Sequence, residues 1–109
     1  MTSVFRSKSQ YLFGRFDMDI KLVAKGSAGT VTTLYMITEG QWQVHDEIDL
    51  DFLGNSTGRP YTLHTNIYGR GKGGPEKQYD FGLIPPKISI PTLTFKCCYT
   101  YISQAHCAQ

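Results

Sequence analysis

Apolar and polar residues alternate along several short segments, with the period of two that is typical of β-strands. The clearest case runs from Arg15 to Val23, where the apolar positions are Phe16, Met18, Ile20 and Leu22. The residues between them are polar or charged. This pattern predicts a half-buried strand with one face in a core.

Three more segments have strand character and are separated by turn-forming residues. Residues 30–38 are rich in β-branched and aromatic side chains, and residues 45–53 and 61–68 are also predicted to be extended. Residues 25–29, 54–60 and 69–75 contain the Gly, Asn, Ser and Pro of turns and loops. No helical period is present. We therefore predict an all-β fold, an antiparallel sheet that forms part of a β-sandwich.

Residues 45–53 carry an unusual concentration of charge. Four of the chain's nine acidic residues lie between positions 46 and 51. In an extended strand, one face would present Glu47, Asp49 and Asp51, and the opposite face Ile48, Leu50 and Phe52. Like charges side by side repel and raise one another's pKa, so this arrangement does not stabilise a sheet. Because the repulsion is unfavourable, we infer that these carboxylates are present for a function.

Three interpretations of this acidic strand follow from the pattern. In a sugar hydrolase or transferase, one carboxylate attacks the anomeric carbon and another protonates the leaving oxygen; retaining enzymes hold the two about 5 to 5.5 Å apart. Positions 47 and 51 lie about 13 Å apart along a straight strand, so this interpretation needs a strongly twisted strand. A calcium site is the second, although a strand lacks the glycine turns and carbonyl ligands of calcium loops. The third is a solvated polar face.

Other motifs are weaker. Residues 69–74 match the spacing of a dinucleotide fingerprint, but no helix or acidic partner follows, so we interpret them as a loop. Asn55 begins an N-glycosylation sequon. His64 and Asn66 share a strand face and could bind hydroxyl groups, or simply face solvent. Trp42 and Tyr68 could stack on sugar rings, although burial is the commoner use of an aromatic.

Composition excludes several classes of function. A net charge of +2 with scattered Lys and Arg favours neither nucleic acid nor a membrane surface as a partner. The first residues are polar and charged and do not form a signal peptide, which taken alone indicates the cytosol. The three cysteines fit no zinc pattern, and we expect no metal.

The end of the chain differs from the rest. Residues 82–86 and Pro91 interrupt any strand pattern, and residues 97–109 show no amphipathic order. We therefore predict a boundary near Asp80, with one domain over residues 1–79 and a divergent tail over residues 80–109.

The residues around the acidic strand resemble a known family. Residues 45–55 read HDEIDLDFLGN, where plant xyloglucan endotransglucosylase/hydrolases of glycoside hydrolase family 16 have HDEIDFEFLGN. Residues 5–8, 11–15, 27–32 and 60–66 also look like segments of this family. The resemblance covers roughly positions 5 to 79, and its motif is highly specific.

This resemblance implies a β-jelly-roll enzyme that is secreted into the plant cell wall and works without a cofactor as a monomer. Such an enzyme cleaves xyloglucan and passes the glycosyl-enzyme to another xyloglucan or to water. By position, Glu47 matches the nucleophile, Asp49 the assisting carboxylate and Asp51 the acid/base. Asn55 matches a glycosylated asparagine, and residues that line the sugar cleft are matched by His64, Asn66 and Glu76.

Three departures from the family pattern matter. Asp51 stands where the family has Glu, and the lost methylene shortens its reach in a geometry where such an error costs about a hundredfold in rate. Gly74 and Pro75 replace Asn and Arg. The resemblance also implies that this chain lacks both ends of the family domain, hence an incomplete jelly roll. The alternative is a non-catalytic, vestigial glucan-binding fragment of the same family.

A frameshift near Asp80 is our hypothesis for the divergent tail. Residues 80–92 can be encoded so that skipping the first two bases yields FWFDPTKDFHTY. This resembles the family's next strand, WFDPTxDFHxY. Sequencing the transcript tests the hypothesis, and a locus without that alternative frame contradicts it.

Overall fold

The structure, a computed structural model, describes residues 2–24, 26–80, 87–96 and 104–108. These residues form nine strands and one short 3-10 helix. In chain order they are β1 (Thr2–Phe5), β2 (Phe13–Lys21), β3 (Val31–Ile37), η1 (Trp42–Val44), β4 (Glu47–Leu53), β5 (Thr62–Gly69), β6 (Lys72–Gly73), β7 (Lys77–Asp80), β8 (Lys87–Lys96) and β9 (Gln104–Ala108).

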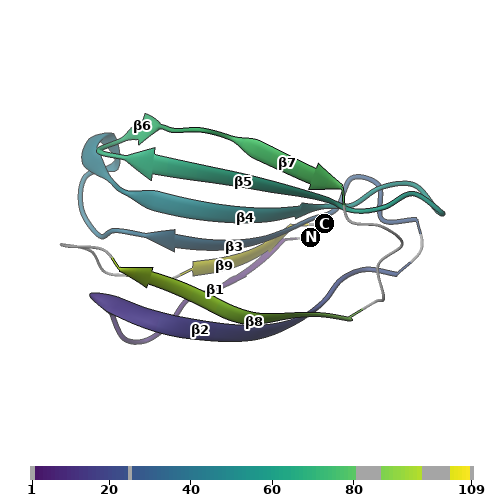
Figure 1. The fold of residues 1–109 in the computed structure, drawn as a ribbon, viewed down its shortest axis with the longest axis horizontal. Coiled ribbons are helices and arrows are strands. Elements are labelled where there is room, and N and C mark those ends of the chain that lie inside the picture. The colour runs from purple at the N-terminus through teal and green to yellow at the C-terminus, as the bar shows by residue number, and fades with distance from the viewer. Residues whose placement is uncertain (1, 25, 81–86, 97–103, 109) are drawn as a thin grey trace.

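The strands form two antiparallel sheets in two layers (Figure 1). The larger sheet has the order β1-β9-β3-β4-β5-β6, and β7 also pairs with β5. The smaller sheet consists of β2 and β8 and lies beneath the larger one in Figure 1. The predicted all-β, antiparallel sandwich is thus confirmed.

The core lies between the two sheets. Its buried members are Ile20, Leu22, Phe52 and Tyr61, and the half-buried Met18, Leu50 and Leu63 pack against them. The predicted alternation therefore directs Met18 and Ile20 of β2, and Leu50 and Phe52 of β4, into one shared core. Phe52 is only 1% exposed and anchors the acidic strand from below.

Strands β5 and β6 form a tight hairpin where the sequence predicted only a loop over residues 69–75. Gly69 pairs with Lys72, so the turn contains two residues, Arg70 and Gly71. Both have positive φ, 52° and 71°, as a type I′ hairpin turn requires. The loop prediction missed β6 because Lys72 and Gly73 have little strand propensity of their own.

The tail contains two strands, β8 and β9. Pro91 had argued against the first, and the lack of amphipathic order in residues 97–109 against the second, so both expectations were wrong for the described residues. Pro91 lies at an irregularity in the pairing of β2 with β8. Phe16 pairs with Leu93 and Met18 with Ile90, so β8 carries one extra residue there. A bulge tolerates proline because the extra residue needs no ladder hydrogen bond. The predicted boundary near Asp80 stays a prediction, and residues 82–86 lie outside the described residues.

Candidate active site

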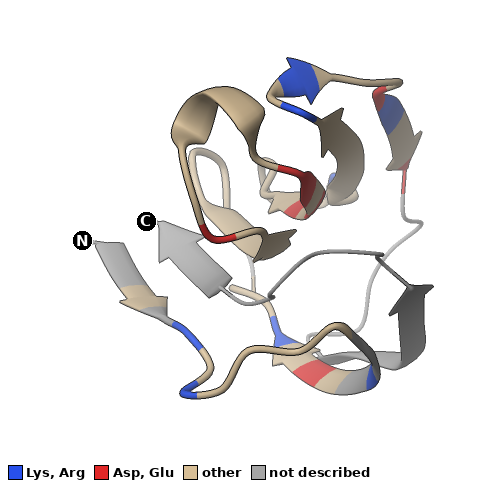
Figure 2. Cartoon of the chain, turned by 90° about the vertical axis from the view of Figure 1, so that its left-hand side faces the viewer, with Lys and Arg blue, Asp and Glu red and all other residues tan. Residues whose placement is uncertain are grey.

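The acidic strand β4 lies inside the larger sheet, between β3 and β5. Figure 2 shows its Asp and Glu positions in the interior of that sheet, with Lys and Arg positions around the outside. The prediction of three carboxylates on one face is confirmed, because all three line one open groove of about 360 Å³. The groove is lined by Thr33, Tyr35, Ile37, Trp42, Glu47, Asp49 and Asp51.

Pairing with the two neighbouring strands gives each carboxylate its own surroundings. Across β3, β4 and β5 the three rows are Ile37–Glu47–Tyr68, Tyr35–Asp49–Asn66 and Thr33–Asp51–His64. Directly paired residues in an antiparallel sheet point to the same face. The register thus gives Glu47 apolar and aromatic neighbours, whereas Asp51 has a hydroxyl and an imidazole.

Glu47 is more enclosed than Asp51, with side chains 13% and 23% exposed. Its Oε2 atom lies 2.9 Å from Nε2 of His45, and the two side chains are 13% and 4% exposed. A hydrogen bond also joins Glu47 to Asp49. Glu47 therefore has a fixed position at one end of the groove.

Asp49 holds a proton more readily than an ordinary carboxyl. Burial, then the charge of Glu47 and the hydrogen bond with it, and lastly the charge of Asp51 raise the pKa of Asp49 to about 7, against a small opposing effect of His64. Burial and the carboxylates of Glu47 and Asp49 likewise raise the pKa of the Tyr35 phenol. In its protonated form, Asp49 can therefore donate a hydrogen bond to Glu47 near neutral pH.

Asp51 is tied down by two side chains. The hydroxyl of Thr33 donates to its Oδ1 atom at 2.7 Å, and Nδ1 of His64 lies 3.4 Å from its Oδ2 atom. Because both oxygens have partners on the sheet itself, the short side chain stays close to the strand. This geometry fits the expectation that Asp51 reaches less far than Glu would.

The three predicted cleft residues behave differently. His64 Nε2 is buried and makes no hydrogen bond to the described residues, although Oε2 of Glu76 lies 3.5 Å away. The side chain of Glu76 is 64% exposed. Asn66 is buried, and its Oδ1 atom accepts the Ile67 N–H at 2.8 Å. The structure thus brings His64 to Asp51 and Asn66 beside Asp49, with Glu76 at the rim.

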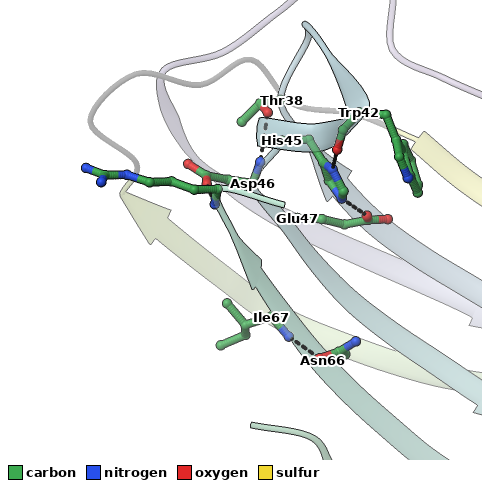
Figure 3. A network of polar contacts seen from close by, with 8 residues as sticks. Thr38, Trp42, His45, Asp46, Glu47, Asn66 and Ile67 are labelled. Atoms are coloured by element: carbon green, nitrogen blue, oxygen red, sulfur yellow. Dashed lines mark hydrogen bonds and ion pairs between the residues drawn. The ribbon is translucent and has the colours of Figure 1, made fainter. Parts of the chain in front are cut away.

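His45 and Asp46 make contacts that the sequence did not predict (Figure 3). Asp46 accepts the Arg70 N–H through Oδ1 at 2.7 Å, and its own N–H donates to the hydroxyl of Thr38 at 2.9 Å. The His45 carbonyl accepts the Gly71 N–H at 2.7 Å. Arg70 is 24 residues from Asp46 in the sequence, whereas Thr38 is only 8 residues away. The only early signal was the position of both residues in the motif.

The two aromatic candidates flank His45. The ring of Trp42 stacks on the imidazole with centroids 4.3 Å apart, and Tyr68 is tilted against it at 5.4 Å. Trp42 is 68% exposed and lines the groove, so it is not a buried core aromatic. It therefore presents apolar surface to whatever occupies the groove.

Asn55 lies in the loop after β4. Its Oδ1 atom accepts the Ser56 N–H at 2.8 Å, and its Nδ2 atom donates to the Pro60 carbonyl at 3.3 Å. An N-linked sugar replaces only one of the two amide hydrogens, so the contact with Pro60 is compatible with modification.

Neither a candidate metal cluster nor a membrane-spanning helix is present among the described residues. No group of three or more His, Cys, Asp and Glu side chains there has a geometry suited to a metal ion. No helix in that part of the chain is long and apolar enough to cross a membrane.

Most of the chain matches a known protein family and several known proteins in sequence. The family described as "Glycosyl hydrolases family 16" matches residues 1–86. Xyloglucan endotransglucosylase protein 7 of Diospyros kaki is 55% identical over 92 residues, which are 84% of this chain and 33% of that protein. Protein 8 of the same species is 62% identical over 77 residues, 71% of this chain and 26% of that protein.

A relative in Arabidopsis thaliana, probable xyloglucan endotransglucosylase/hydrolase protein 16, is 56% identical over 85 residues. These residues are 78% of this chain and 28% of that protein. The chain thus spans about a third or less of the length of these relatives.

Proposed function

Since the chain belongs to glycosyl hydrolase family 16, we propose that it acts on xyloglucan as an endotransglucosylase/hydrolase with a retaining, double-displacement mechanism. The observation that carries the proposal is the groove in which Glu47, Asp49 and Asp51 lie side by side on one strand. Relatives with 55% to 62% identity are named for activity on xyloglucan.

Glu47 is the proposed nucleophile. One of its oxygens attacks the anomeric carbon as the bond to the leaving sugar oxygen breaks, and the leaving oxygen takes a proton from Asp51. Asp51 then removes a proton from an acceptor sugar hydroxyl or from water, whose oxygen displaces Glu47. Asp49 supports Glu47 through the hydrogen bond between them.

The sugar chain would lie along the groove across the strands. Trp42 offers an exposed ring for stacking, and Glu76 an exposed carboxylate for hydroxyls. His64 and Asn66, the cross-strand partners of Asp51 and Asp49, are the other two positions that we propose contact the sugar. We further propose that the protein is secreted to the cell wall, is glycosylated at Asn55 and works as a monomer.

A second candidate function is glucan binding without turnover. Asp51 favours it, because the Thr33 and His64 contacts hold this short carboxylate against the sheet. Binding would need only the groove and its aromatic and polar lining, not a mobile acid/base.

A transfer assay distinguishes the two functions. The purified chain is incubated with xyloglucan and a labelled xyloglucan oligosaccharide, and label in long products is measured. We expect transfer that Glu47→Gln abolishes and Glu39→Gln leaves unchanged, because Glu39 is an exposed residue away from the groove. If the chain is retained on xyloglucan but no labelled product forms, the proposed enzymatic function is wrong and glucan binding without turnover is supported.

A further inference from the structure

His45 is a buried polar residue whose two ring nitrogens have different partners. Nδ1 contacts the backbone carbonyl oxygen of Trp42, and Nε2 faces Oε2 of Glu47 at 2.9 Å (Figure 3). A carbonyl oxygen only accepts hydrogen bonds, so Nδ1 must carry a hydrogen. The Trp42 carbonyl therefore selects the tautomer of His45.

This tautomer limits what Nε2 can do. In neutral imidazole with hydrogen on Nδ1, Nε2 carries a lone pair, which repels an ionised carboxylate. The contact with Glu47 is attractive in two states: imidazolium with charged Glu47, or neutral imidazole with protonated Glu47. In both states one proton lies between Nε2 and Oε2.

The imidazole is also held in place on its faces and through its backbone. Trp42 stacks on one side at 4.3 Å and 21°, and Tyr68 approaches at 5.4 Å. The backbone is fixed by the Gly71 N–H on the His45 carbonyl and by the contacts of Asp46 with Arg70 and Thr38. A ring held in this way has no freedom to turn away from Glu47.

We propose that His45 is a positioning residue for the nucleophile Glu47, oriented by the Trp42 carbonyl and holding a proton against Oε2. This inference rests on the proposed function. When Glu47 forms the glycosyl ester it loses its negative charge, and the proton stays on Nε2 of His45. When the acceptor oxygen displaces Glu47, the carboxylate regains its charge beside the imidazolium. The other ionisable groups facing the pair are Asp49, Tyr35 and Tyr68.

Two amide variants separate the roles of the ring nitrogens. His45→Gln places an N–H near the position of Nε2 and keeps a donor for Glu47, whereas His45→Asn places one near Nδ1 and keeps only the Trp42 contact. We expect Gln to retain transfer within about tenfold, and Asn to lose about a hundredfold in kcat with little change in KM. Equal activity of the two variants overturns the proposal.

The pH profile gives a second readout. The neutral amide of His45→Gln does not stabilise a charged carboxylate as an imidazolium does, so the acidic limb of the rate profile should move to higher pH. An unmoved acidic limb contradicts a proton held between His45 and Glu47.

Nitrogen NMR of the histidine side chains in the whole chain tests the pair without any activity. We expect His45 Nδ1 to carry hydrogen throughout the range of about pH 5 to 8. Its Nε2 resonance should change in Glu47→Gln and not in Glu39→Gln. A neutral His45 with hydrogen on Nε2, or no response to Glu47→Gln, overturns the inference. Wild-type chain with the expected resonances but no transfer instead refutes the proposed function and leaves the pair established.

Discussion

The two ends of the acidic strand are built differently. At the Glu47 end, a buried histidine, a stacked indole and a hairpin turn surround the carboxylate. At the Asp51 end, one hydroxyl and one imidazole hold a shorter side chain, and Nε2 of that imidazole lacks a hydrogen bond to the described residues. The first end is held by contacts from residues 42–45 and from the hairpin turn at Gly71, whereas the second depends on the two neighbouring strands.

This difference indicates where the chain tolerates change. A nucleophile must be placed within a fraction of an ångström of the anomeric carbon, and if Glu47 has this proposed role, the loop contacts behind it would provide that precision. Asp51, the proposed acid/base, is shorter than the Glu that the family resemblance implies, and Thr33 and His64 hold it against the sheet. Substitutions at the two ends should therefore change the rate of transfer in opposite directions: a change at Glu47 should lower it, and a longer side chain at position 51 should raise it.

The largest expected effect is on the rate, when the proposed nucleophile Glu47 is removed. Glu47→Ala should lower the rate by at least about a thousandfold. With azide and an aryl xyloglucan oligosaccharide, azide attacks the anomeric carbon directly and aryloxide leaves, giving a glycosyl azide of inverted configuration. Asp51→Ala should give the retained azide, because azide then displaces Glu47 from the ester. Product NMR distinguishes the two, and inverted product from the Asp51 variant would contradict the assignment.

The second-largest expected effect comes from lengthening the proposed acid/base, Asp51. Asp51→Glu extends the carboxyl beyond the contacts with Thr33 and His64, and should raise transfer by about a hundredfold. Asp80→Glu is the matched control, since Asp80 also accepts a hydrogen bond from a cross-strand threonine, Thr62, but lies outside the groove. Initial rates with labelled acceptor measure the effect. An unchanged rate in Asp51→Glu would show that reach does not limit this site.

The support behind Glu47 can be broken at the hairpin turn. Gly71 has φ of 71°, and a Cβ there would lie 2.0 Å from the Gln43 carbonyl oxygen. Gly58 has φ of 81° with open space around it. Gly58→Ala should cost about 1 kcal/mol in free energy of unfolding, and Gly71→Ala about 3 kcal/mol because the clash adds to the strain. Thermal unfolding followed by circular dichroism compares them, and equal losses would refute packing of the turn against residues 42–44.

The sequence predicted the three carboxylates of this site better than the contacts that hold them in place. Period-two alternation placed Glu47, Asp49 and Asp51 on one face because strand geometry alone decides that outcome. The resemblance assigned their roles. The contacts of His45 with Gly71 and of Asp46 with Arg70 depend on a turn more than twenty residues away, and no local pattern encodes such contacts.

In the fold, too, features that depend on a local pattern were predicted, and features that depend on long-range pairing were not. Core residues of β2 and β4 followed from their alternation, since burial of an apolar face is a local signal. Strand β8 did not, because Pro91 argues against a strand unless its bulge is known. The bulge arises from pairing with β2, which is a long-range property.

The smallest effect concerns Asp49, between the two ends. Its pKa is raised from 3.8 to about 7, so the folded chain binds this proton more tightly than the unfolded chain. Stability is therefore lost as pH rises from about 4 through about 7, where the folded state must release the proton. Asp49→Asn removes this loss and keeps an uncharged side chain of similar shape. Below about pH 4 the variant and wild type should melt alike, and at about pH 8 the variant should melt on the order of 5 °C higher. Glu39→Gln, at the surface, should show no such divergence, and parallel melting curves for Asp49→Asn and wild type would contradict a shared proton in the middle of the groove.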